Sequence, residues 1–171
     1  IGRRRMLILL RERAEELGVD LRYECEFGSA EDFKDEYDLV VACDGINSSV
    51  RGEYTDHFRP DIDVRDCKFI WLGTSQKFDD AFTFIFEETK HGWVWVHAYQ
   101  FDDNTATVIA ECTNETWEKF GFADMSKEQT ISTCEEIFSD YLGGHSLRSN
   151  ADHLRGSAVW MNFPRVICEK W

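Results

Sequence analysis

Alternating apolar and polar positions in the middle of the chain predict an antiparallel sheet. Four runs rich in β-branched and aromatic residues are separated by turn residues, the pattern of a meander. These runs cover residues 67–73, 82–88, 93–101 and 105–111. Residues 102–104 form a short polar turn between the last two runs. The pattern therefore predicts four consecutive strands.

The third run divides its side chains cleanly between two faces, because successive residues of a strand point to opposite sides. Val94, Val96 and Ala98 share one face. The opposite face carries the candidate substrate-binding residues Trp93, Trp95, His97 and Tyr99. Such a face can line a pocket for an aromatic ring. The alternative is a core of aromatic side chains covered by helices, in which the polar ring of His97 would need a partner.

Helical spacing appears both before and after these strands in the sequence. Met6, Leu10, Ala14 and Leu17 form one apolar helix face, and Gly18 supplies a stop. Residues 115–120 and 126–141 are two further expected helices, the second beginning with a capping box, and residues 156–163 are a final expected strand. Three arginines at positions 3–5 face the positive end of the first helix dipole. Either a bound anion relieves this conflict, or the helix begins earlier, or the arginines extend into solvent.

A continuous apolar run at Leu39–Cys43 predicts a buried strand of a parallel sheet, followed by a turn at Asp44 and Gly45. Ligands of such sheets bind beyond the carboxyl ends of the strands. We expect Asp44 to accept a ribose hydroxyl and Gly45 to allow close approach of a ligand. Asn47 or Ser48 can cap the following helix, and the free N–H groups of that helix favour an anion.

This segment resembles the Asp-Gly motif of the class A flavin-dependent aromatic monooxygenases, the p-hydroxybenzoate hydroxylase-like family. The family pattern is an apolar strand, Asp-Gly, two residues, Ser, two residues and Arg, met here at Asp44, Gly45, Ser48 and Arg51. The first helix also fits a family pattern, in which Arg3 takes the position of an arginine that lies against FAD. The resemblance implies that these five residues bind FAD, with NAD(P)H as co-substrate.

Within the family, the likeness is greatest to the salicylyl-CoA 5-hydroxylase and 2-aminobenzoyl-CoA monooxygenase/reductase branch. It is carried by residues 58–64, 69–74, 81–84, 91–93 and 153–157. The branch implies hydroxylation of an aromatic ring, with an aromatic acyl-CoA thioester as substrate and O₂ as oxidant. It also allows a C-terminal flavin reductase domain in the parent protein. The flavin carries the chemistry, so no protein side chain is assigned as a covalent catalyst.

The expected fold class is α+β, combining part of a Rossmann-like FAD-binding domain with an antiparallel-sheet substrate domain. We expect the partial FAD domain at 1–52, a connection at 53–65, the substrate domain at 66–163 and a return to the FAD domain at 164–171. The family's Gly-x-Gly-x-x-Gly turn does not occur in this sequence. The resemblance therefore implies an internal fragment of a larger flavoprotein, inactive alone.

Composition narrows the function only loosely. The net charge of −14 argues against a nucleic-acid partner, which would call for a basic patch. No apolar run approaches a membrane span. Six cysteines and five histidines show no metal-binding spacing and no Ser/His/Asp pattern, so we expect no metal and reduced cysteines in the cytoplasm.

Two other classes stay open. A flavin-dependent halogenase or reductase shares the fold and part of the Asp-Gly motif. A non-enzymatic module could instead use the aromatic face to hold a protein or a hydrophobic ligand. A structure with that face fully covered, and with no opening beside Asp44, would favour this second class.

Overall fold

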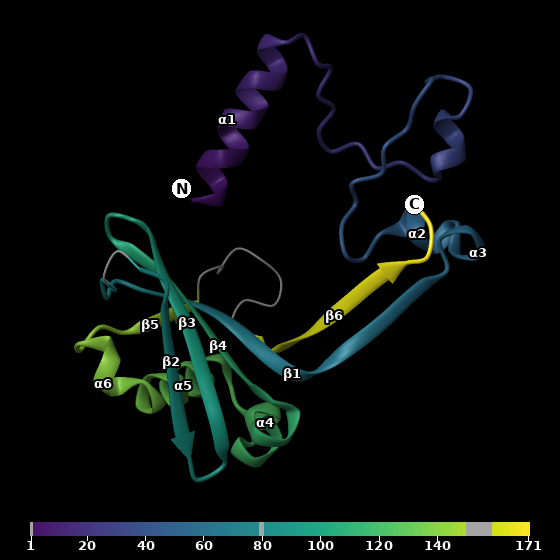
Figure 1. Ribbon diagram of the computed structural model, residues 1–171. Helices are drawn as coiled ribbons and strands as arrows, with labels where there is room; N and C mark the ends of the chain where they lie inside the picture. Colours follow the sequence, from purple (N-terminus) through teal and green to yellow (C-terminus); the bar gives the residue numbers. More distant parts are fainter. Residues whose placement is uncertain (1, 79–80, 150–158) are drawn as a thin grey trace. The chain divides into compact units, whose positions relative to one another are not determined.

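The computed structural model describes residues 2–78, 81–149 and 159–171, and its fold combines helices with an antiparallel sheet (Figure 1). The chain divides into two compact units. One contains Arg65–Phe163, and the other contains Arg3–Val64 together with Pro164–Trp171. The combination of helices with an antiparallel sheet confirms the α+β class.

The sheet has the strand order β2-β3-β4-β1-β5, and a further strand, β6, pairs with β1. Its strands are β1 (Pro60–Thr74), β2 (Thr83–Thr89), β3 (Gly92–Asp102), β4 (Thr105–Thr113), β5 (Leu147–Ser149) and β6 (Met161–Cys168). The pairs β2–β3, β3–β4, β1–β4 and β1–β5 are all antiparallel. The four predicted strands are therefore confirmed.

The order of these strands departs from the predicted meander. Strands β2, β3 and β4 follow one another, but β1 lies beside β4 and not beside β2. A two-residue turn would have forced β1 and β2 together. The longer connection at 75–82 removes that constraint. The short strand β5 was not predicted, and β6 begins later than expected; residues 156–158 of the predicted final strand lie outside the described residues.

The helices of this unit follow β4 as α4 (Asn114–Phe120), η2 (Phe122–Asp124), α5 (Lys127–Ile137) and α6 (Ser139–Leu142). The predicted capping box is confirmed, because Ser126 and Gln129 exchange hydrogen bonds between side chain and backbone. The single helix expected over 126–141 is wrong, since it breaks at Phe138. Phe138, at the break, and Leu142 in α6 are both buried in the core.

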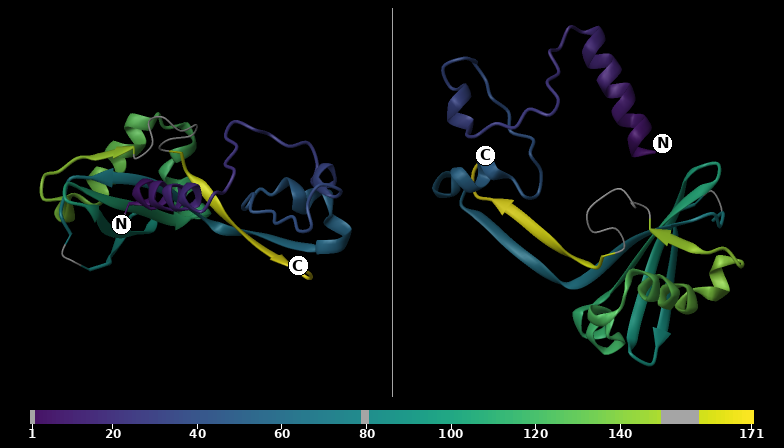
Figure 2. Two further views of the ribbon diagram at one scale, coloured as in Figure 1. Left: turned by 90° about the horizontal axis from the view of Figure 1, so that it is seen from above. Right: turned by 180° about the vertical axis from the view of Figure 1, so that it is seen from behind.

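The core lies on the face of the sheet that carries Val94, Val96 and Ala98. Val94, Val96 and Ala98 are almost fully buried, and they pack in one cluster with Phe122, Cys134, Phe138 and Leu142 from the helices. Figure 2 shows these helices lying along the sheet. The opposite, aromatic face contributes none of its candidate residues to this core.

The second unit contains α1 (Arg3–Glu16), η1 (Ala30–Phe33), α2 (Ser49–Glu53) and α3 (Thr55–Phe58). Helix α1 confirms the spacing argument, and Gly18 follows it at a φ of 78°. None of its residues is buried, so Met6 and Leu10 remain exposed. The arginines at 3–5 are also exposed.

The strand expected in this unit is absent, and the prediction of a buried strand at Leu39–Cys43 is wrong for the described chain. Leu39 is 78% exposed and Val41 is 70% exposed. No strand forms at residues 19–25 either. A strand is stable only when neighbouring strands satisfy its backbone groups, and no described strand pairs with either segment. The Rossmann-like sheet is therefore not seen among the described residues. The expected connection at 53–65 holds α3 and the first residues of β1.

A substitution at Gly92, in the β2–β3 hairpin, tests how tightly this hairpin packs against α4. A Cβ at this position would lie 2.4 Å from Oγ1 of the buried Thr116, at a φ of 125°. We expect Gly92→Ala to lower the free energy of unfolding by about 1–3 kcal/mol or more, because overpacking adds to backbone strain. Urea unfolding followed by tryptophan fluorescence measures this.

Gly144→Ala is the matched control, because Gly144 has a φ of 80° but no atom within 4 Å of a new Cβ. It carries the strain alone, about 1–2 kcal/mol. Equal losses for the two variants would contradict the packing argument.

Candidate functional site

The predicted acidic turn forms a compact loop without a flanking strand. The Ser48 amide donates to the Gly45 carbonyl at 3.1 Å, closing a turn in which Gly45 has a φ of 83°. The Ser48 side chain accepts the Arg51 amide at 2.9 Å and caps α2, as predicted. Helix α2 has only 5 residues, too short for the helix dipole to make the expected anion site.

Asp44 is held as an ionised hydrogen-bond acceptor. Its Oδ2 accepts the Ser49 hydroxyl and the Val50 amide, both at 3.2 Å. The hydroxyl of Ser48 contributes most to lowering the Asp44 pKa to about 2, and the Val50 and Ser49 donors lower it further. A carboxylate stabilised by neutral donors in this way stays charged at neutral pH, and its other lone pairs can accept a ligand hydroxyl.

Arg51 turns back onto its own loop. Its guanidinium donates to the Gly45 carbonyl at 3.4 Å and also to the Ile46 carbonyl. The fork geometry of arginine lets one side chain satisfy both carbonyls. In this structure, Arg51 therefore fixes the shape of the turn.

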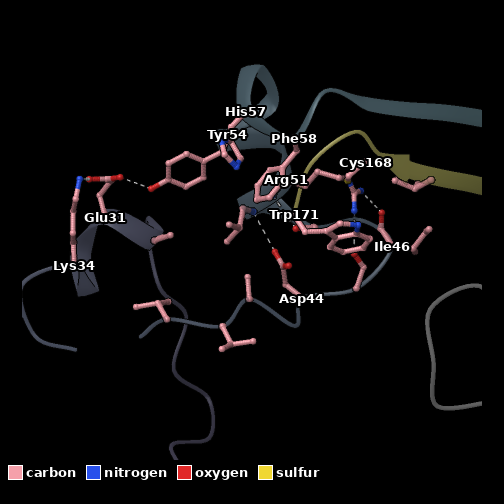
Figure 3. A pocket seen from close by; sticks show the side chains of 18 residues that line it. Glu31, Lys34, Asp44, Ile46, Arg51, Tyr54, His57, Phe58, Cys168 and Trp171 are labelled. Carbon is pink, nitrogen blue, oxygen red and sulfur yellow. Dashed lines mark hydrogen bonds and ion pairs between the residues drawn. The ribbon is translucent and has the colours of Figure 1, made fainter. Parts of the chain in front are cut away.

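A cavity of about 940 Å³ opens beside the turn, entirely within this unit (Figure 3). Asp44, Gly45, Ser48 and Arg51 line it, and thus four of the five predicted cofactor residues come together. Arg3 is not among the lining residues. This volume falls in the range of ligand pockets, roughly 300–1,000 Å³.

Other lining residues had no signal in the sequence. Tyr54 and Phe58 belong to the α2–α3 segment, and Trp171 is the last residue of this sequence. The Tyr54 hydroxyl donates to Glu31, which raises the pKa of Tyr54 to about 12. Glu31 and Trp171 are distant from the turn in the sequence, and only folding brings them to the same cavity.

The predicted substrate residues form an open aromatic face on the other unit. We define the aromatic face by side chains of β2 and β3 and by the residue that precedes β2: Phe82, Phe84, Phe86, Trp93, Trp95, His97 and Tyr99. Phe82 stacks on Tyr99 at 5.0 Å and on His97 at 5.7 Å between ring centroids. Phe84 and Phe86 are each 60% exposed. Among the described residues, the helices cover the opposite face. None of these rings belongs to the buried core, in contrast to the alternative of an aromatic core.

Glu111 on β4 is a polar member of this face that the sequence analysis missed. Its Oε2 accepts the Trp95 indole N–H at 2.9 Å, and its Oε1 lies 3.2 Å from Nδ1 of His97. The His97 and Glu111 side chains are only 22% and 15% exposed. His97 thus has the partner that a polar ring among aromatics requires. The contact between Glu111 and His97 follows from the strand register, which pairs Trp95 with Glu111 and cannot be read from the sequence.

Sequence comparison places the chain among monooxygenases. It is 35% identical to salicyloyl-CoA 5-hydroxylase from a Streptomyces species over the whole of this chain. It is 30% identical to protodeoxyviolaceinate monooxygenase from Chromobacterium violaceum over 95% of this chain. It is 27% identical, over the whole chain, to 3-hydroxy-4-methyl-anthranilyl-[aryl-carrier protein] 5-monooxygenase from Streptosporangium sibiricum. No family model matches.

These matches along the chain confirm the resemblance to aromatic monooxygenases found in the sequence. It spans 33% of the salicyloyl-CoA 5-hydroxylase and 42% of each of the other two proteins. Most of each relative therefore lies outside the matched region. Within the described residues, no helix is long and apolar enough to cross a membrane.

The cause of the low Asp44 pKa can be tested by removing the hydroxyl groups of Ser48 and Ser49 one at a time. We expect Ser48→Ala to raise the Asp44 pKa from about 2 towards its ordinary value, and Ser49→Ala to raise it less. Because the folded pKa is lowered, the stabilisation from Asp44 is complete above the unfolded pKa and is lost as the pH falls towards 2. In Ser48→Ala the stabilisation should be smaller and its loss complete at a higher pH, because the folded pKa lies closer to the unfolded pKa.

NMR titration of the Asp44 carboxyl carbon in the two variants and the unaltered chain provides the measurement. An unchanged pKa in Ser48→Ala, or a larger rise in Ser49→Ala, would show that the Ser48 hydroxyl is not the main cause.

Proposed function

We propose that this chain is part of a flavin-dependent monooxygenase that hydroxylates an aromatic ring, with FAD held at the acidic turn and the ring held on the aromatic face. The observation that carries the proposal is the match to three monooxygenases through the region that contains both features. NAD(P)H is the proposed reductant and O₂ the oxidant.

The residues of the turn fit a flavin dinucleotide in two respects. Asp44 offers an ionised acceptor that suits a ribose or ribityl hydroxyl. A Cβ at Gly45 would meet no atom within 4 Å, so the backbone there is open to a ligand. Arg51 and Ser48 support this loop through its own hydrogen bonds. Their proposed role is thus to hold the turn in a binding shape, and contact of Arg3 with FAD stays a prediction from the resemblance.

An aromatic acyl thioester is the proposed substrate. Two of the three relatives carry such a compound in their names, one linked to CoA and one to an aryl-carrier protein. The flat rings around Trp93, Trp95, His97 and Tyr99 suit offset stacking against a substrate ring. The net charge of −14 gives an anionic CoA no long-range attraction, so binding would depend on local contacts.

The protein's own part in the reaction is to bind and orient. When bound, the reduced flavin supplies the activation of O₂. Trp93, Trp95 and Tyr99 would hold the ring, and the surrounding apolar surface would keep water from it. No side chain of the chain is assigned a covalent role.

The test uses the intact protein purified from its native source, so that any segment beyond these 171 residues is present. Its visible spectrum reports bound flavin. NAD(P)H oxidation is then measured with salicylyl-CoA, 2-aminobenzoyl-CoA and free salicylate. Oxidation stimulated by a CoA ester supports the full proposal, and stimulation by the free acid alone removes the thioester. Absence of flavin contradicts the proposal.

Asp44→Asn tests the proposed flavin contact at nearly constant shape. Losing a charge-assisted hydrogen bond costs about 1.5–3 kcal/mol, so we expect FAD to bind at least about tenfold more weakly. Flavin fluorescence during titration measures this in the intact protein. Asp35→Asn is the control, because Asp35 is an exposed residue outside the cavity lining. Equal flavin affinity in the two variants would place the cofactor elsewhere.

A further inference from the structure

The hydrogen bonds of Glu111 leave one polar atom free at the centre of the aromatic face. Both carboxylate oxygens of Glu111 are engaged, one by the Trp95 indole and the other facing Nδ1 of His97. The opposite ring nitrogen of His97, Nε2, has no hydrogen-bond partner among the described residues. The neighbouring Phe82 and Phe84 rings offer no conventional donor or acceptor to it.

The carboxylate also decides which nitrogen of His97 carries the proton. An ionised carboxylate only accepts hydrogen bonds, so the nitrogen that faces it must be protonated. In the neutral imidazole the other nitrogen is then a lone-pair acceptor. Glu111 therefore favours the tautomer with hydrogen on Nδ1 and makes Nε2 an acceptor.

We propose that Glu111 is a positioning residue that sets this tautomer, so that His97 Nε2 selects aromatic rings bearing a hydroxyl or amino hydrogen-bond donor. The inference rests on the proposed function, because it assigns the substrate ring to the aromatic face. Stacking alone tolerates almost any ring, since every aromatic ring has a flat face. A single acceptor amid apolar rings discriminates more sharply, because a buried polar group left without a partner is costly.

The tautomer itself is tested first, without substrate or flavin. Long-range ¹H–¹⁵N NMR of the full chain distinguishes the protonated from the unprotonated ring nitrogen, and His97→Gln assigns the signals. We expect hydrogen on Nδ1 in the unaltered chain. In Glu111→Gln, the amide oxygen can still accept the Trp95 indole while the amide NH₂ faces Nδ1. The hydrogen should then move to Nε2.

The control is Glu88→Gln, which removes a carboxylate from the same face, where Glu88 pairs opposite Trp93. Among the described residues, Glu88 makes no hydrogen bond or ion pair with His97, so the tautomer should stay as in the unaltered chain. A merely structural role for Glu111 would leave the His97 tautomer unchanged in Glu111→Gln. Hydrogen on Nε2 in the unaltered chain, or no change in Glu111→Gln, overturns the proposal.

Selection is tested next, in the intact protein, with 2-hydroxybenzoyl-CoA and 2-methoxybenzoyl-CoA as the matched pair. The methoxy ring accepts hydrogen bonds but donates none. We expect the hydroxy compound to bind about tenfold more tightly, the factor that corresponds to one hydrogen bond. In Glu111→Gln, protonated Nε2 can donate to either ring, so the preference should largely disappear. A preference due to ring size would persist in that variant.

The outcomes separate this inference from the proposed function. Flavin-dependent oxidation with equal affinity for the two rings, or a preference that survives in Glu111→Gln, overturns the inference alone. A protein that lacks flavin and binds neither ring overturns both. Tenfold preference in the unaltered protein and its loss in Glu111→Gln, but not in Glu88→Gln, support the inference.

Discussion

The alternation of side chains along β3 is the constraint on which the sheet unit depends. Because neighbours point to opposite faces, sealing Val94 and Val96 against the helices forces Trp95 and His97 outwards. A shift of one residue in register would bury the aromatic rings and expose the valines. The same register brings Glu111 beside Trp95. The packing of the core and the chemistry of the open face are thus two results of one strand pairing.

The acidic turn depends on a different kind of stabilisation. Its bonds are local: Ser48 caps α2, Arg51 binds the Gly45 carbonyl, and Asp44 accepts donors within six residues. Local hydrogen bonds of this kind do not require a neighbouring strand. The turn therefore keeps its shape even though the run before it is exposed and forms no strand.

The two candidate sites share one principle. In each, a carboxylate is fixed by neutral donors: hydroxyl and amide groups for Asp44, and an indole N–H for Glu111, whose other oxygen faces the His97 ring. Neutral donors hold a charge in place without cancelling it, so the carboxylate can still orient a further group. In a chain of net charge −14, recognition by such fixed acceptors suits hydroxyl and amino groups better than anions.

The sequence by itself determined the local features. Spacing predicted α1, periodicity predicted β1 to β4 and the two faces of β3, and motif spacing located the Asp44 turn, because each depends on residues close together in the chain. Only the tertiary structure decided which face was covered, that β1 lies beside β4, and that Glu111 reaches His97. The strand expected at Leu39–Cys43 failed for the same reason: a strand's hydrogen bonds come from neighbours that local patterning cannot supply.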